Sequence, residues 1–229
     1  MRDHTIQNRL KRYLLDRLQL LKIEELDLPA QAKDEFDDIY HHSILPGEGK
    51  FISYKSDYPV YQFLNYLIEN KNVLVHGSNN HMIDSFEPKE STLFNGRPIK
   101  AVFAASDGVW SLFFSVKNRR DYAGSLRNLC LTVPTKKGIR RYYYFSIINE
   151  EVEDIWTSGT IYILPKDQFN RGGIRDEWVC EQNVKPLAKL SVASTDFPFI
   201  EEIRTHAESE SILKTILKAL FFKRNNNSK

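Results

Sequence analysis

Hydrophobic residues recur every three to four positions in several stretches of the chain, which is the spacing of one face of an α-helix. In the first stretch the apolar positions are Ile6, Leu10, Tyr13, Leu14, Leu18 and Leu21. Leu28-Pro29 should end this helix, because proline disfavours helical backbone in the residue before it. On the same spacing, we expect helices over residues 5–25, 60–70, 107–116 and 200–222. A short acidic helix is expected over residues 33–41, and another helix over residues 119–130.

Other stretches are short and rich in β-branched and aromatic residues, which is typical of strands. The longest is IRRYYYFSII, and the full set covers residues 73–76, 99–105, 139–148, 159–164, 177–180 and 188–192. These strands follow one another with few helices between them, so the chain lacks the alternation of a doubly wound sheet and is predicted to be α+β. We expect an N-terminal helical extension packed on the core (1–70), a central domain (71–200), and a C-terminal helix with a basic tail (201–229).

Composition narrows the class of protein. The chain has 229 residues, of which 41% are hydrophobic and 27% charged, as in an ordinary globular domain. The net charge of +2 does not favour nucleic acid or an anionic membrane as a partner, although a nucleic-acid partner stays possible. No apolar run approaches the ~20 residues that span a bilayer. We therefore expect a cytoplasmic protein with no membrane partner, whose two cysteines, Cys130 and Cys180, are buried, reduced thiols.

The stretch VLVHGS, Val73 to Ser78, is the first that suggests chemistry. A histidine at the end of a strand projects at the rim of a sheet, and Gly77 allows a sharp bend and a close approach by a ligand. With the Ser78 hydroxyl, His76 could bind a polyhydroxy ligand such as a ribose. The alternative is a histidine bonded to nearby backbone, followed by a glycine in an ordinary turn.

Two further stretches extend the pattern. Residues 96–114 predict a strand followed by an aromatic-rich helix, and residues 159–192 predict two strands joined by a Gly-rich, Arg-bearing loop, with Glu177 opening the second strand. Together the three stretches, over about residues 73–192, resemble the ADP-ribosyltransferase fold in its His-Tyr-Glu branch. That branch includes diphtheria-toxin-like enzymes, poly-ADP-ribose polymerases, rifampin-modifying transferases and RNA 2′-phosphotransferases. The resemblance implies a split antiparallel sheet, and the predicted N- and C-terminal helices flank it without matching the family.

The resemblance also implies roles for individual residues. His76, with Gly77 and Ser78 beside it, corresponds to the histidine that binds ribose hydroxyls. Phe103 occupies the place of the family's tyrosine, so a ring remains to stack on nicotinamide but the hydroxyl is missing. Glu177, in the run Asp-Glu-Trp-Val, corresponds to the catalytic glutamate.

One carboxylate is sufficient for the implied reaction. A glycosidase needs a second carboxyl group to protonate its leaving group, whereas the nicotinamide of NAD is already cationic. Glu177, or Glu181 as the alternative, would stabilise the oxocarbenium-like ribose and orient the nucleophile. Phe103 and Trp110 could hold the cationic ring by cation–π attraction, worth ~0.5–2 kcal/mol, and the alternative for both is core packing.

Three arginines, Arg97, Arg171 and Arg175, are candidates for phosphate contacts, with exposed loop residues as the alternative. Family members that modify arginine usually carry Gln or Glu two positions before the catalytic glutamate. Arg175 stands there in this chain, so an arginine acceptor is not indicated.

We therefore expect NAD as the substrate, an acceptor and an oligomeric state that the sequence leaves open, and no metal, because the histidines lack ligand spacing. Three alternatives stay open: a non-catalytic NAD or ADP-ribose module of the same fold, an RNA 2′-phosphotransferase-like enzyme that relies on arginines, and an interaction protein whose three stretches match by chance.

Overall fold

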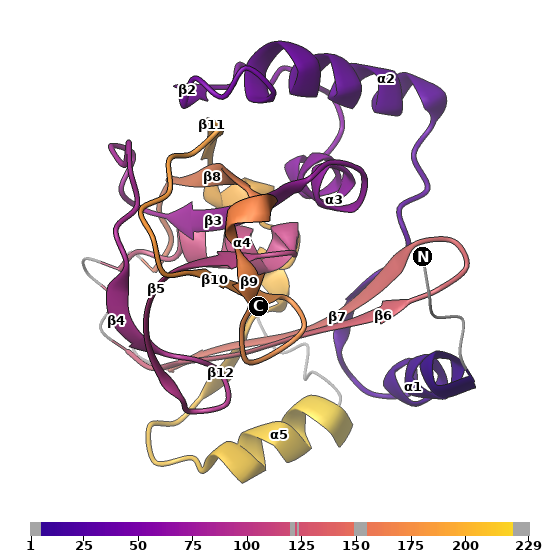
Figure 1. The fold of residues 1–229 in the computed structure, drawn as a ribbon. Helices are drawn as coiled ribbons and strands as arrows, with labels where there is room; N and C mark the ends of the chain where they lie inside the picture. Colours follow the sequence, from indigo (N-terminus) through magenta and orange to yellow (C-terminus); the bar gives the residue numbers. More distant parts are fainter. Residues whose placement is uncertain (1–5, 120–121, 123, 149–154, 222–229) are drawn as a thin grey trace. The chain divides into compact units, whose positions relative to one another are not determined.

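The structure is a computed structural model that describes residues 6–119, 122, 124–148 and 155–221 (Figure 1). The chain forms two compact units. Unit 1 contains Met1–Leu26, Ala123–Glu153 and Phe199–Lys229, and unit 2 contains Asp27–Tyr122 and Asp154–Pro198. This grouping cuts across the linear division into 1–70, 71–200 and 201–229, because the middle segment of unit 1 interrupts the sequence of unit 2.

Unit 2 is built on an eight-stranded sheet, in which neighbouring strands follow the order β2-β11-β8-β3-β5-β10-β9, with β4 beside β5. All of its strand pairs are antiparallel except the one between β2 and β11. The strands are β2 (Lys50–Phe51), β3 (Val73–Ser78), β4 (Lys89–Thr92), β5 (Pro98–Ala105), β8 (Gly159–Pro165), β9 (Asn170–Arg171), β10 (Glu177–Cys180) and β11 (Ala188–Val192). The five strands predicted for this unit are present, although β3 extends two residues beyond its predicted end at His76. The mixture of helices with mostly antiparallel sheets confirms the α+β class.

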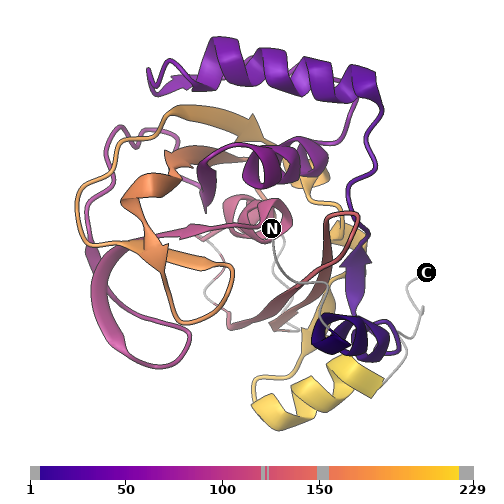
Figure 2. The same ribbon diagram turned by 45° about the vertical axis from the view of Figure 1, so that its right-hand side comes forward.

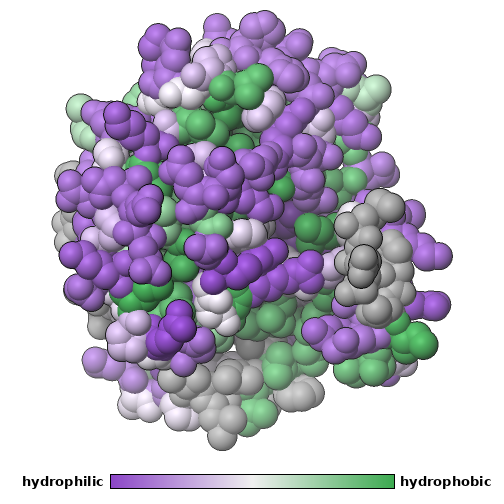
Figure 3. Space-filling model, in the orientation of Figure 1, coloured by the Kyte–Doolittle hydropathy of each residue, from purple (hydrophilic) through white to green (hydrophobic). Residues whose placement is uncertain are grey.

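Three α-helices belong to unit 2: α2 (Ala30–Ile39), α3 (Val60–Asn70) and α4 (Gly108–Val116). Helix α4 packs on β3 and β8, and α3 contacts both α4 and α2 (Figures 1 and 2). Helix α2 buries the apolar side chains of Ala32 and Phe36. The side of this helix that faces solvent is largely hydrophilic (Figure 3). Short helical segments complete the unit: a π-helix after α2 (Tyr40–Ile44) and 3-10 turns at Lys166–Gln168 and Ser194–Asp196.

Helix α4 begins as the sequence predicts. The Asp107 side chain accepts a hydrogen bond from the Trp110 backbone N–H at 2.8 Å, so Asp107 is the N-cap. The backbone N–H of Gly108, the first residue of α4, donates to Asn65 Oδ1 of α3 at 3.0 Å. Both bonds satisfy donors that a helix start leaves without intrahelical partners, and they fix the position of α4 over the sheet.

Two glycines allow α4 to lie very close to the sheet. A Cβ atom on Gly77 of β3 would lie 2.0 Å from the Ser111 carbonyl oxygen, and one on Gly159 of β8 would lie 1.9 Å from the Ser115 carbonyl oxygen. Side chains at these positions would collide with the helix backbone. Gly77 is therefore required by the close packing of strand and helix.

Unit 1 contains a four-stranded sheet around a central strand, β7 (Ile139–Ile148). Strand β6 (Leu126–Pro134) pairs with it over nine residues, while β1 (Leu21–Ile23) and β12 (Arg204–His206) pair with successive parts of it. The remaining elements are α1 (Ile6–Leu15), α5 (Ile212–Phe221) and a 3-10 turn at Ile200–Glu202.

Three helix predictions are wrong in unit 1. The helix over 5–25 ends at Leu15, because Leu21–Ile23 pair with β7. The helix over 119–130 is replaced by β6, although residues 120, 121 and 123 lie outside the described residues. The helix over 200–222 is confined to α5, because β12 also pairs with β7, and the basic tail lies outside the described residues. In each case backbone pairing with β7 outweighs local helical periodicity.

Helix α1 contacts β6, and none of its residues is buried. Its apolar side chains Ile6, Leu10, Tyr13 and Leu14 are each more than 50% exposed. Cys130 and Cys180 are buried free thiols, as predicted. Within the described part of the chain, no helix has the length and apolar character needed to cross a membrane.

Candidate functional site

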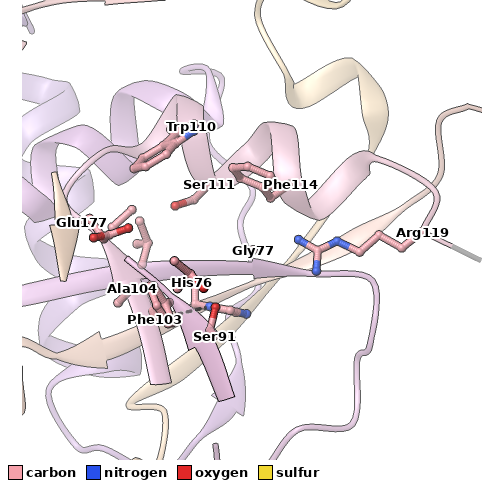
Figure 4. Close-up of a pocket in the computed structure, with 13 residues that line it drawn as sticks. His76, Gly77, Ser91, Phe103, Ala104, Trp110, Ser111, Phe114, Arg119 and Glu177 are labelled. Carbon is pink, nitrogen blue, oxygen red and sulfur yellow. Dashed lines mark hydrogen bonds between the residues drawn. The ribbon is translucent and has the colours of Figure 1, made fainter. Parts of the chain in front are cut away.

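A pocket of about 430 Å³ lies in unit 2 between α4 and strands β3, β5 and β10 (Figure 4). This volume is within the range of small-molecule sites. Its walls combine a few polar and charged groups with aromatic rings. The lining residues are Val75, His76, Gly77, Ser91, Thr92, Phe103, Ala104, Ala105, Trp110, Ser111, Phe114, Arg119 and Glu177.

His76 lies where two neighbouring strands separate. Strand β3 pairs with β5 only at Val75 and Ala105, although it stays paired with β8 as far as Ser78. His76 is therefore inside a strand, and the expectation that the strand ends there is wrong. Its Nδ1 lies 2.8 Å from the Phe103 carbonyl oxygen of β5 and bridges the two strands beyond their last pair.

The environment of His76 keeps its imidazole neutral. Burial lowers the pKa of His76 to about 4, the charges of Arg119 and Lys89 lower it further, and the bond to the Phe103 carbonyl opposes the shift. Because that carbonyl can only accept, Nδ1 carries the proton and Nε2 is an acceptor. Nε2 can thus accept a hydrogen bond from a ligand hydroxyl.

Glu177 is the first residue of β10, opposite Ala105, and is buried. Its Oε2 accepts from the Phe94 backbone N–H at 3.3 Å, and its Oε1 accepts from the Gly173 N–H. A Cβ on Gly172 would lie 2.5 Å from Oε1, so the Gly-rich loop closes tightly around the carboxylate. These bonds fix the carboxylate, and each oxygen keeps a lone pair for a ligand hydroxyl.

Aromatic rings line both walls of the pocket. Trp110 and Phe114 project from α4, with ring centroids 6.0 Å apart in an edge-to-face arrangement. Phe103 lines the opposite wall on β5 (Figure 4). Rings on two sides suit a flat, cationic ligand group.

The pocket therefore brings together His76, Gly77, Phe103, Trp110 and Glu177. Ser78 and Glu181 are not among its lining residues. The Ser78 hydroxyl accepts from the Asn80 N–H at 3.1 Å, while Glu181 is exposed beyond the other end of β10. Of the two candidate acids, Glu177 is the one that reaches this pocket.

The three arginines that the sequence suggested for phosphate do not line the pocket. Arg97 is exposed in the turn between β4 and β5. Arg171 lies 4.0 Å over the ring of Trp178, whose side chain points to the opposite face of β10 from Glu177. Arg175 is exposed, and its carbonyl accepts from Arg171.

Sequence reasoning missed several lining residues, above all Arg119, with Ser91, Thr92, Ser111 and Phe114. Phe114 follows Trp110 by one helical turn, so helical spacing could have identified it. Arg119 gives no such signal, because it lies beyond the end of α4 in a run of basic residues. Only the path of the chain after α4 brings its guanidinium to the pocket (Figure 4).

No protein-family model matches the chain, and no curated protein or solved structure does either. Among the described residues, no group of three or more His, Cys, Asp or Glu side chains is arranged to hold a metal ion. The geometry of the pocket is therefore what indicates a function for this chain.

Proposed function

We propose that unit 2 has an ADP-ribosyltransferase-like split sheet, binds NAD in this pocket, and transfers ADP-ribose to an acceptor with release of nicotinamide. One observation carries the proposal. His76 and Glu177 come from distant parts of the sequence and line one pocket, on the strands β3 and β10 that flank β5. If the chain has the fold that its sequence resembles, His76 and Glu177 must line the same pocket. If the short stretches matched by chance, there would be no reason for the two residues to lie together.

The chemistry divides between these residues. Neutral His76 accepts a hydrogen bond from a ribose hydroxyl at Nε2. The fixed carboxylate of Glu177 faces the positive charge that develops on the ribose as the bond to nicotinamide lengthens. Because its backbone bonds hold it in place, little reorganisation is needed when that charge appears. Phe103 and Trp110 contact the nicotinamide ring.

The test measures nicotinamide released from NAD by chromatography. Glu177→Gln keeps the size and hydrogen-bonding oxygen but removes the charge, so release should fall by about 100-fold or more. Glu181→Gln is the matched control, since it makes the same chemical change at an exposed position outside the pocket, and its rate should equal that of the wild type. Equal rates for wild type and Glu177→Gln would contradict the proposed transferase.

A second candidate is a non-catalytic module that binds NAD or ADP-ribose. Phe103 favours it, because the ring lacks the hydroxyl of the family's tyrosine. The two backbone bonds of Glu177 also give that residue a structural role in holding the β4–β5 turn and the Gly-rich loop. Tight NAD binding with no release of nicotinamide above background would identify this module.

An RNA 2′-phosphotransferase-like activity has less support. It would need Arg97, Arg171 and Arg175 to converge on the pocket and Glu177 to point away. The three arginines lie outside the lining, and Glu177 is part of it.

A further inference from the structure

Arg119 gives the pocket a cation at one end. It follows α4, and its side chain turns back toward Phe114 and Gly77 (Figure 4). The guanidinium carbon lies 5.7 Å from the centre of the Phe114 ring. Glu177 lies toward the other end of the labelled cluster, and among the ion pairs of the described residues none joins the two.

The backbone that carries Arg119 is held in place. Asn79 Oδ1 accepts from the Arg119 N–H at 3.0 Å, and Asn79 Nδ2 donates to the Ser115 carbonyl at 2.6 Å. The preceding residues pair with a separate segment: the Asn118 N–H donates to the Ile155 carbonyl at 2.9 Å. The arginine therefore starts from a fixed point beside the pocket, although the residue is partly exposed to solvent.

Among the described residues, the charges that act on His76 and Lys117 at this end of the pocket are positive. Desolvation lowers the pKa of Arg119, and among the residues that the structure describes no carboxylate opposes this shift. Its charge in turn lowers the pKa values of His76 and Lys117. An anionic group placed here would therefore relieve repulsion between cations, as well as pair with the guanidinium.

We propose that Arg119 forms a phosphate subsite that holds the diphosphate of a nucleoside diphosphate ligand in this pocket. The assignment deepens the proposed function and partly rests on it, because it places the two ends of NAD: the reacting ribose beside Glu177 and the diphosphate beside Arg119. It also replaces Arg97, Arg171 and Arg175 as the phosphate contact. Guanidinium is suited to this task, since it binds two phosphate oxygens at once.

The test is calorimetric titration of the full chain with NAD, ADP and nicotinamide riboside, which carries no phosphate. Arg119→Gln should weaken ADP and NAD binding by about 10- to 100-fold, as expected for loss of a charged hydrogen-bond donor, and change riboside binding less than twofold. Arg119→Lys, which keeps the charge, should lose less than Arg119→Gln. Arg97→Gln is the matched control and should bind all three ligands like the wild type.

The outcomes separate the subsite from the transferase. If ADP binding depends on Arg119 but NAD releases no nicotinamide, the subsite stands and the transferase fails. If NAD is turned over and Arg119→Gln binds ADP as tightly as the wild type, the subsite is overturned alone. An equal loss for ADP and riboside also overturns the subsite, since the variant has then disturbed the whole pocket. A wild type that binds neither NAD nor ADP overturns both.

Discussion

At the scale of single residues, the pocket depends on side chains whose hydrogen bonds are already fixed. His76 is held by the Phe103 carbonyl, and Glu177 by two backbone N–H groups. After these bonds are formed, each side chain still has hydrogen-bond acceptors for a ligand: Nε2 of the imidazole and the remaining lone pairs of the carboxylate oxygens. The residues are therefore preorganised, which lowers the cost of arranging them around a ligand.

The lowered pKa of His76 predicts that stability depends on pH. Its pKa is about 4 in the folded protein and about 6.5 in an unfolded chain. Between these values the unfolded chain binds the proton more tightly, so the free energy of unfolding should fall as the pH drops from about 6.5 to about 4, by about 3 kcal/mol in all. At higher pH this contribution is fully retained.

Urea denaturation at pH 7.5 and pH 4.5 measures the effect. His76→Gln removes the titrating group, so its loss of stability between the two pH values should be smaller than that of the wild type. His206, whose pKa burial also lowers, acts in the same direction and is present in both proteins, so it cancels. Identical pH dependence in the two proteins would refute the assignment to His76.

At the scale of elements, the pocket depends on how closely α4 approaches the sheet. The approach is possible because Gly77 and Gly159 present no side chains to the helix backbone. Asp107 and Asn65 fix the start of the helix, and Asn79 fixes its end. These contacts hold the helix that carries Trp110 and Phe114, which line the wall of the pocket opposite Phe103 (Figure 4).

Gly77→Ala should destabilise the protein strongly. The added methyl group would meet the Ser111 carbonyl oxygen at 2.0 Å and the Ser115 N at 2.9 Å, and both are backbone atoms that a rotamer change cannot move. We expect a loss of about 3 kcal/mol or more in the free energy of unfolding, measured by urea denaturation. Ser78→Ala, one position along the same strand, should cost less than about 1 kcal/mol. Similar losses for the two variants would show that the close contact is not maintained in solution.

At the scale of the whole molecule, the chain divides into two units that interrupt each other in sequence. All three tryptophans, Trp110, Trp156 and Trp178, belong to unit 2. Tryptophan fluorescence therefore reports on unit 2, while far-ultraviolet circular dichroism reports on both units. The two signals can test whether the units unfold together.

Glu210→Ala should weaken unit 1 selectively. Its buried carboxylate accepts from Thr215 at 2.8 Å and pairs with Arg127 and Lys218. The bonds from Lys218 and Thr215 lower the pKa of Glu210, against the effect of burial. Removing it leaves a largely buried arginine without its acid, which should cost about 2 kcal/mol. In this variant the circular dichroism signal should begin to change at a lower urea concentration than the fluorescence. Coincident transitions would show that the two units unfold as one.

The local sequence determined the elements whose signal is contained in their own residues. The five predicted strands of unit 2, the strand Ile139–Ile148 and helices α3 and α4 follow their hydrophobic patterns closely, and Asp107 is the N-cap that its position indicates. The short strands β2, β4 and β9 carry no such pattern and are not among the predicted strands. The α+β class follows from the order of these elements. In the pocket, the sequence identified His76, Phe103, Trp110 and Glu177 as residues of interest, because polar or aromatic side chains stand out beside apolar strands.

Tertiary structure decided what depends on contacts between distant segments. Leu21–Ile23, Leu126–Pro134 and Arg204–His206 are strands because β7 offers them backbone hydrogen-bonding partners, which their own periodicity does not reveal. The same holds for the exclusion of Glu181 from the pocket lining, and for the presence there of Arg119 and not of Arg97, Arg171 or Arg175. The sequence gives the type of each side chain, whereas the fold determines which side chains from distant segments lie next to one another. A pocket is formed by such neighbours, so its composition depends on the tertiary structure.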